Sequence, residues 1–223
     1  MKQAGYNVQA FTGPALNKQP RNPRQRDVAV IIAGGPSLTR EDVAKVEQAD
    51  VDIIGINNAY QICSRMEIHY ACDTKWWRAH WDKIPDGPAR YSLKDGRKNK
   101  QDSGVPGVIQ LRMGNRRGLS DEWPFVCWGG NGGYQAINLA YLLGYKKVVL
   151  LGYDMSEQNK KAHWHSDHNF PGSTNPCKST FTMWRKDFEP LASALQKKGI
   201  EVVNVTRRTL LSAFPQATLE EIL

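Results

Sequence analysis

The feature that most constrains the fold is a short apolar run that recurs along the chain and ends each time in a glycine or a polar residue. The run Val28–Ala33 (VAVIIA) is unbroken and rich in β-branched residues, which is typical of a strand buried on both faces of a parallel sheet. Similar runs follow at Val51–Ile56, Met66–Cys72, Pro124–Trp128, Lys147–Leu151 and Glu201–Val205.

Helical segments are expected between these runs, at Thr74–Trp81, Tyr134–Leu143 and Thr182–Lys198. Parallel neighbours in a sheet need crossover connections, and these are usually helices. The sequence therefore predicts the α/β class, as a Rossmann-like, doubly wound, mostly parallel sheet with helices on both faces.

Length and cysteine spacing set the domain organisation. A chain of 223 residues can bury a core without disulfides, and its four cysteines form no C-x-x-C pair, so we expect them to be reduced and mostly buried. Residues 1–26 are polar and basic, without apolar periodicity, and are predicted to be a loosely ordered N-terminal arm. Residues 27–223 are predicted to form a single nucleotide-binding domain.

The net charge of +8 indicates a surface that attracts polyanions. Basic residues gather between Arg90 and Arg117, in a predicted loop excursion at about residues 83–122. This segment either contacts an anionic acceptor, such as a glycan or DNA, or is a solvated loop. No stretch approaches the roughly 20 apolar residues of a membrane span, and the N-terminus lacks the apolar core of a secretory signal. We therefore expect a cytoplasmic protein without a membrane partner.

Candidate binding residues follow the predicted strands, because ligands of parallel sheets bind at the carboxyl ends of the strands. Glycine turns let the backbone approach a phosphate, and helix N-termini offer free N–H groups to an anion, although a tight turn without a ligand has the same sequence. We expect one crevice to collect the nucleotide-binding candidates Gly34, Gly35, Ser37, Asn57, Asn58, Asp73, Asn131, Gly132 and Gly133.

Two aspartates end strands in this pattern. Asp154 follows the run Lys147–Leu151 and is expected to face the same crevice as a catalytic candidate. Asp73 has two open interpretations: a Mg²⁺ ligand on a di- or triphosphate, or the N-cap of the helix that follows it.

The segment after Asp154 contains three histidines, His163, His165 and His168. Histidines near neutral pH can act as a general base or bind a phosphate; a metal site or no chemical role at all are the alternatives. We favour His165 as the base because it lies between Trp164 and Asp167, whose carboxylate favours proton acceptance.

Longer motifs resemble one superfamily. Val30–Leu38 (VIIAGGPSL), Gly55–Asn58 (GINN) and the stretch from Gly132 to Asp154 are similar to the 6-hydroxymethylpterin diphosphokinase-like proteins, the flagellin-modifying motility accessory factors and the family 42 sialyltransferases. The likeness spans about residues 27–220 and extends to Thr209–Phe214 (TLLSAF). The compact domain also suggests a phage or mobile-element origin.

The resemblance implies a nucleotide held by the glycine turn, Asn57 and residues 131–133. Ser156 stands where the sialyltransferases have a tyrosine, and no histidine occurs near Ser179 where they have their base. The expected activity is a transferase, glycosyltransferase-like, with a nucleotide or nucleotide-sugar donor. The alternatives are a Mg²⁺-ATP-dependent diphosphokinase using Asp73 and Asp154, and a non-enzymatic nucleotide- or nucleic-acid-binding module.

Overall fold

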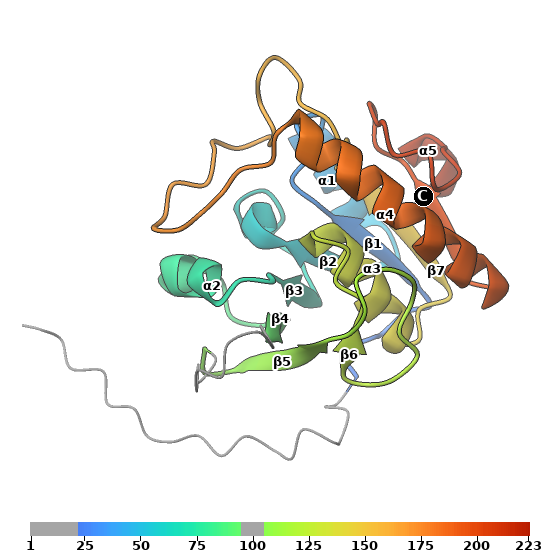
Figure 1. Ribbon diagram of the computed structural model, residues 1–223, viewed down its shortest axis with the longest axis horizontal. Coiled ribbons are helices and arrows are strands. Elements are labelled where there is room, and N and C mark those ends of the chain that lie inside the picture. The colour runs from blue at the N-terminus through green and yellow to red at the C-terminus, as the bar shows by residue number, and fades with distance from the viewer. Residues whose placement is uncertain (1–21, 95–104) are drawn as a thin grey trace, which may run out of the picture.

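A single eight-stranded parallel sheet forms the centre of the protein, which is described by a computed structural model for residues 22–94 and 105–223. The strand order is β6-β5-β4-β3-β2-β1-β7-β8 (Figure 1). The predicted fold class is therefore confirmed. The strands are β1 (Val28–Ile32), β2 (Asp52–Ile56), β3 (Ile68–Tyr70), β4 (Ala89–Lys94), β5 (Val108–Met113), β6 (Phe125–Val126), β7 (Lys147–Leu151) and β8 (Glu201–Asn204).

Strand β1 lies inside the sheet and its side chains pack on both faces. Ala29 and Ile31 belong to one hydrophobic cluster, whereas Val30 and Ile32 belong to the cluster on the opposite face. Successive side chains of a strand point to opposite faces, so an unbroken apolar run is what a strand with two covered faces requires.

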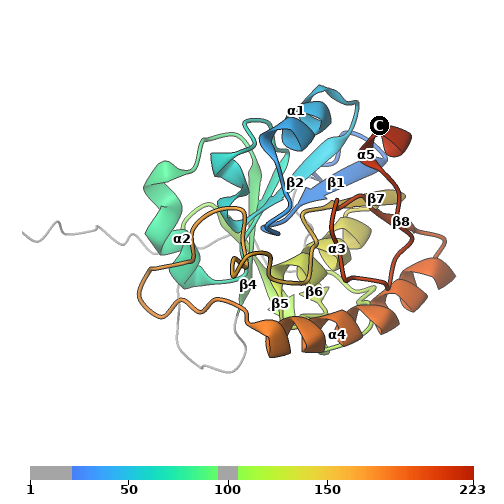
Figure 2. The same cartoon turned by 90° about the horizontal axis from the view of Figure 1, so that it is seen from above.

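Helices cover the two faces of the sheet (Figures 1 and 2). Apolar residues of α3 and α4 pack in the first cluster, and those of α1 and α5 pack in the second. No helix in the described parts of the chain is long and apolar enough to cross a membrane. The helices are α1 (Arg40–Gln48), α2 (Thr74–His80), α3 (Gly132–Leu142), α4 (Lys178–Lys197) and α5 (Leu219–Ile222), with short 3₁₀ turns at Asn57–Gln61 and Trp81–Lys83.

The basic segment corrects our sequence interpretation, because it is not a loop excursion. It contributes β4 and β5, which extend the sheet in parallel. In β4, Tyr91 and Leu93 are buried while Arg90 is partly buried and Lys94 is exposed. The Arg90 guanidinium lies 4.6 Å from the centroid of the Trp81 ring and donates to the Pro85 carbonyl and to Asp86, so the charge is stabilised by an aromatic face and by oxygen acceptors.

The predicted N-terminal arm also needs a correction at its end. The backbone N–H groups of Gln25 and Arg26 donate to Asp52 Oδ2 at 2.7 and 3.1 Å, and Arg24 Nη1 donates to the Gly144 carbonyl at 3.1 Å. These residues therefore belong to the folded domain. The arm prediction for residues 1–21, and the part of the basic segment at 95–104, lie outside the described residues.

Candidate functional site

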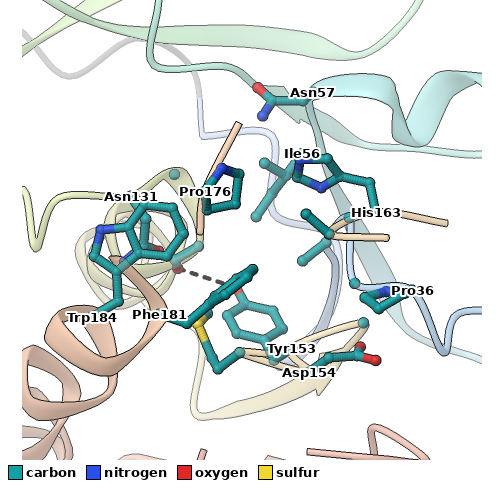
Figure 3. Close-up of a pocket in the computed structure, with 18 of the residues that line it drawn as sticks. Pro36, Ile56, Asn57, Asn131, Tyr153, Asp154, His163, Pro176, Phe181 and Trp184 are labelled. Carbon is teal, nitrogen blue, oxygen red and sulfur yellow. Dashed lines mark hydrogen bonds between the residues drawn. The ribbon is translucent and has the colours of Figure 1, made fainter. Parts of the chain in front are cut away.

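A cleft opens at the carboxyl ends of β1, β2 and β7, beside the N-terminus of α3 (Figure 3). We call it the central cleft. Strand order reverses between β1 and β7, and such switch points are where doubly wound sheets bind ligands. Its lining includes these predicted residues: Gly34, Gly35, Asn57, Asn131, Gly132, Gly133, Asp154, His163, His165 and His168.

Three predicted binding residues do not line the cleft. Ser37 turns its backbone N–H to Asp154 Oδ1 at 2.8 Å. Asn58 is buried, and its Oδ1 accepts a 2.9 Å hydrogen bond from Trp76 Nε1. Asp73 is exposed where α2 begins. Within the described residues no three His, Cys, Asp or Glu side chains are grouped so that they could hold a metal ion.

The space beside the glycine turn after β1 is filled by another part of the chain, the carboxylate of Asp154. A Cβ atom on Gly35 would lie 1.9 Å from Asp154 Oδ2, and the Gly35 N–H donates to the Gly152 carbonyl at 2.8 Å. The Asp154 carboxylate thus takes the position we had expected for a phosphate, and accepts from Ser37 as an anion would. The turn needs glycine because the loop after β7 approaches it closely.

Asp154 is almost fully buried, at 1% exposed. Burial raises the pKa of Asp154 to about 6, although hydrogen bonds from Ser37 and Gln158 favour its ionised form. The second carboxylate oxygen, Oδ2, is buried without a hydrogen-bond partner. Figure 3 shows the carboxylate directed away from the middle of the central cleft. Asp154 therefore acts as a connector between two turns and not as the group that faces a ligand.

The N-terminus of α3 is the anion site that remains available. Asn131 caps the helix by accepting from the Tyr134 N–H at 2.8 Å. The N–H groups of Gly132 and Gly133 lie in the first turn, where a helix provides no internal acceptor, and both residues line the cleft. Together with the positive end of the helix dipole, these groups favour a phosphate at this position.

Asn57 faces the central cleft from the opposite side (Figure 3). Its backbone is left-handed, with φ of +48°, and its carbonyl accepts from His69 Nε2 at 2.8 Å. His69 is fully buried, and burial lowers the pKa of His69 to about 4. The neutral ring must carry its proton on Nε2, because a carbonyl can only accept. His69 thereby holds the backbone turn that presents the Asn57 amide.

The three predicted histidines form one cluster above the cleft. The His163 and His165 ring centroids are 4.9 Å apart with nearly parallel planes, and the His168 ring lies 5.1 Å from each. Burial lowers the pKa of His163 and of His168 to about 4 and lowers the pKa of His165 as well. All three imidazoles are therefore neutral at pH 7, and burial makes each a weaker base than a free imidazole.

The loop that carries the histidines is fastened to the glycine turn, since the Trp164 N–H donates to the Gly34 carbonyl at 3.1 Å. His165 Nδ1 lies 2.5 Å from the Ser166 carbonyl. A carbonyl oxygen can only accept, so Nδ1 carries the ring proton and Nε2 carries the lone pair that can accept one. This is the tautomer that a general base requires.

Sequence reasoning missed the apolar wall of the cleft. Phe181 and Trp184, from the first turns of α4, and Pro176 before it all line the cavity (Figure 3). Phe181 and Trp184 are three positions apart and share a helix face, with ring centroids 5.6 Å apart. That spacing was present in the sequence, but the predicted helix began at Thr182 and so excluded Phe181.

Two arginines of the basic segment form ion pairs with a buried carboxylate. Arg116 Nη2 and Arg117 Nε lie 2.8 and 2.5 Å from the carboxylate oxygens of Asp187, which is fully buried in α4. These arginines therefore neutralise an internal charge, and since two guanidinium groups meet one carboxylate, one positive charge remains in excess there.

Comparison with known proteins identifies no relative: no protein-family model, curated protein or solved structure matches the chain.

Proposed function

We propose that this protein is a nucleotide-dependent transferase, whose nucleotide-sugar donor binds in the central cleft with its phosphate at the N-terminus of α3. The N–H groups of Gly132 and Gly133 supply the anion contacts. The Asn57 amide lies across the cleft as a polar contact, and Phe181 and Trp184 provide apolar walls for a base or a sugar ring. The resemblance to nucleotide-sugar-using sialyltransferases points to the same class of donor.

The observation that carries the proposal is His165, a neutral imidazole with a tied Nδ1–H and a lone pair on Nε2, on the wall of the cleft. In the transfer, Nε2 takes the proton of the acceptor hydroxyl, and the hydroxyl oxygen forms a bond to the anomeric carbon of the sugar. The bond between that carbon and the phosphate oxygen breaks, and its electron pair leaves with the nucleotide. The N–H groups of α3 stabilise the departing phosphate.

We do not propose a diphosphokinase. That activity required Asp73 and Asp154 to hold Mg²⁺ beside the phosphates, but Asp73 lies outside the central cleft and Asp154 is engaged by Ser37 and Gln158. The nucleic-acid-binding alternative depends on the basic segment from Arg90 to Arg117, of which residues 95–104 lie outside the described residues.

The donor site can be tested with a matched pair of substitutions at Gly132. Proline is tolerated in the first turn of a helix, where it removes an N–H that has no internal acceptor, and the extended backbone of Asn131 (φ −152°, ψ 155°) suits a residue before proline. Gly132→Ala adds a carbon but keeps the N–H. We measure the affinity of both variants for CMP, UDP, GDP and ADP, with and without Mg²⁺, by calorimetry.

Gly132→Pro should lower the affinity for the tightest-binding nucleotide about 10- to 100-fold, which is the effect of a lost hydrogen bond to a charged group. The affinity for the corresponding nucleoside should not change. Gly132→Ala should bind like the wild type. If the two folded variants bind nucleotide with equal affinity, the phosphate does not bind at the N–H of Gly132.

His165 is tested by hydrolysis of the donor, with water as the acceptor. His165→Ala should bind nucleotide normally and release it from a nucleotide-sugar about 10² to 10⁴ times more slowly, as for a lost general base. His168→Ala serves as the matched control from the same cluster. An unchanged hydrolysis rate in His165→Ala would exclude this residue as the base.

A further inference from the structure

A second cavity lies on the other side of His165. It has a volume of about 320 Å³, within the range of small-molecule sites, and we call it the lysine pocket. His165 lines both this cavity and the central cleft, so the proposed base stands between two spaces. The residues of the lysine pocket are Lys160, Lys161, Trp164, His165, Ser166 and Asp167.

The lysines sit on a tight turn that is fixed by several contacts. Gln158 and Lys161 exchange two backbone hydrogen bonds of 2.9 Å, and the two residues between them, Asn159 and Lys160, are both left-handed, with φ of +50° and +62°. The turn is also attached to Asp154, because Gln158 Nε2 donates to its Oδ1 at 2.7 Å. The backbone that carries the two lysines is therefore held in place at the edge of the cavity.

Lysine is an unusual choice at the second left-handed position of such a turn, where glycine is strongly preferred. Backbone strain of this kind is commonly retained where a side chain has a task. The lining contains two lysines, Lys160 and Lys161, and one acidic residue, Asp167, so the cavity carries an excess of positive charge. Its contents should therefore include an anion.

The remaining lining is suited to a carbohydrate. Trp164 offers an aromatic ring to the apolar face of a sugar, and its indole Nε1 has no acceptor in the described parts of the chain. Ser166 and Asp167, both exposed, can bond to hydroxyl groups. A ligand that complements the lysines, the tryptophan and the aspartate of this lining has a negative charge, an apolar face and hydroxyl groups.

We propose that the lysine pocket is the acceptor site, and that the acceptor is a sugar or polyol bearing a carboxylate or a phosphate group. The proposal rests on the proposed transferase function and specifies its second substrate. The negative group contacts Lys160 and Lys161, and the sugar extends past His165 so that its nucleophilic hydroxyl enters the central cleft. There the proton goes to Nε2, the hydroxyl oxygen bonds to the anomeric carbon of the donor, and the bond from that carbon to the phosphate oxygen breaks.

The test measures binding of three hexoses by NMR titration of the full chain: glucuronate, glucose 6-phosphate and uncharged glucose. The variants are Lys160→Gly, Lys161→Gln and their combination, with Lys197→Gln at the distant end of α4 as a charge-matched control. Lys160→Gly also removes an unfavourable backbone conformation, so its melting temperature should equal or exceed that of the wild type. Loss of binding in this variant would not reflect unfolding.

We expect the charged hexoses to bind at least about tenfold more tightly than glucose, and each lysine variant to lose about two- to fivefold of that affinity, as expected for solvent-accessible ion pairs. The difference should shrink in high salt. The stronger of glucuronate and glucose 6-phosphate identifies the anionic group. Equal binding of glucose, an equal loss in Lys197→Gln, or no binding of either charged hexose at millimolar concentration would overturn the proposal.

Nucleotide binding measured on the same samples separates the two proposals. If the wild-type protein binds nucleotides but no charged hexose, the proposed donor site stands and the proposed acceptor site is refuted. Binding of charged hexoses without any nucleotide would support the lysine pocket as an anionic-sugar site and overturn the transferase function.

Discussion

Replacement of Gly35 by alanine should destabilise the fold far more than the same replacement at its neighbour Gly34. A Cβ at position 35 would lie 1.9 Å from Asp154 Oδ2 and 2.4 Å from the Gly152 carbonyl oxygen. The carboxylate must leave, and its hydrogen bond from the Ser37 N–H is lost. At position 34 the nearest atom is His163 Nδ1, at 3.2 Å, which belongs to a side chain on a loop.

The magnitude follows from three contributions. Loss of a hydrogen bond to a charged group costs about 1.5 to 3 kcal/mol, and overpacking against a backbone carbonyl costs about 1 to 3 kcal/mol. Alanine also restricts the unfolded chain more than glycine does, which stabilises the folded state by about 0.4 to 1 kcal/mol. Gly35→Ala should therefore lose about 2 to 5 kcal/mol, which lowers the melting temperature by about 4 to 20 °C in a chain of this size.

The assay is equilibrium unfolding in urea at pH 7, with Gly34→Ala as the control. We expect Gly34→Ala to stay within about 1 kcal/mol of the wild type. In an Asp154→Ala background, Gly35→Ala should cost less, because only the contact with Gly152 remains. A free energy of unfolding for Gly35→Ala within 1 kcal/mol of the wild type would refute the close approach of Asp154.

Two further predictions concern charge. Burial lowers the folded pKa of His163 and of His168 to about 4, below the usual 6.5 of a free imidazole, so the stability they contribute is complete above pH 6.5 and is lost as the pH falls toward 4. Unfolding of the wild type between pH 7 and 4 should show a loss of about 3 kcal/mol for each of the two histidines that a variant with both His163→Gln and His168→Gln lacks; parallel curves would contradict it. Replacing both Arg116 and Arg117 by alanine leaves Asp187 buried and unpaired, and should cost about 3 to 5 kcal/mol in urea unfolding, whereas a loss below 1 kcal/mol would show that the carboxylate reaches water.

The interior of the sheet was predictable from sequence, and its edge was not. Strand β1 is covered on both faces, so its apolar run is continuous and easily recognised. Strand β4 has Tyr91 and Leu93 buried on one face, and on the other the buried Ser92 stands between the basic residues Arg90 and Lys94. Its composition suggested a solvated loop, because the aromatic ring that covers the Arg90 guanidinium comes from another element.

The sequence indicated which residues lie at the candidate site, but it did not indicate what each of them contacts there. Topology brought Asn57, Asn131 and the histidines to one cleft, as the strand ends indicated. The glycine turn was expected to bind a phosphate, but it receives the carboxylate of Asp154, 117 positions from Ser37. A local motif shows that a turn can accept an anion, but it cannot show which anion the fold supplies.

The carboxylate of Asp154 has a consequence for how the two cavities communicate. Its Oδ1 accepts from Ser37 beside the central cleft and from Gln158 in the turn that carries the lysines, so one atom joins the supports of both sites. If a ligand in either cavity shifts this oxygen, the coupling must be reciprocal: a ligand in one cavity changes the affinity of the other cavity by the same factor in both directions. Because the pKa of Asp154 is about 6, protonation of this carboxylate in mildly acidic solution would change that factor.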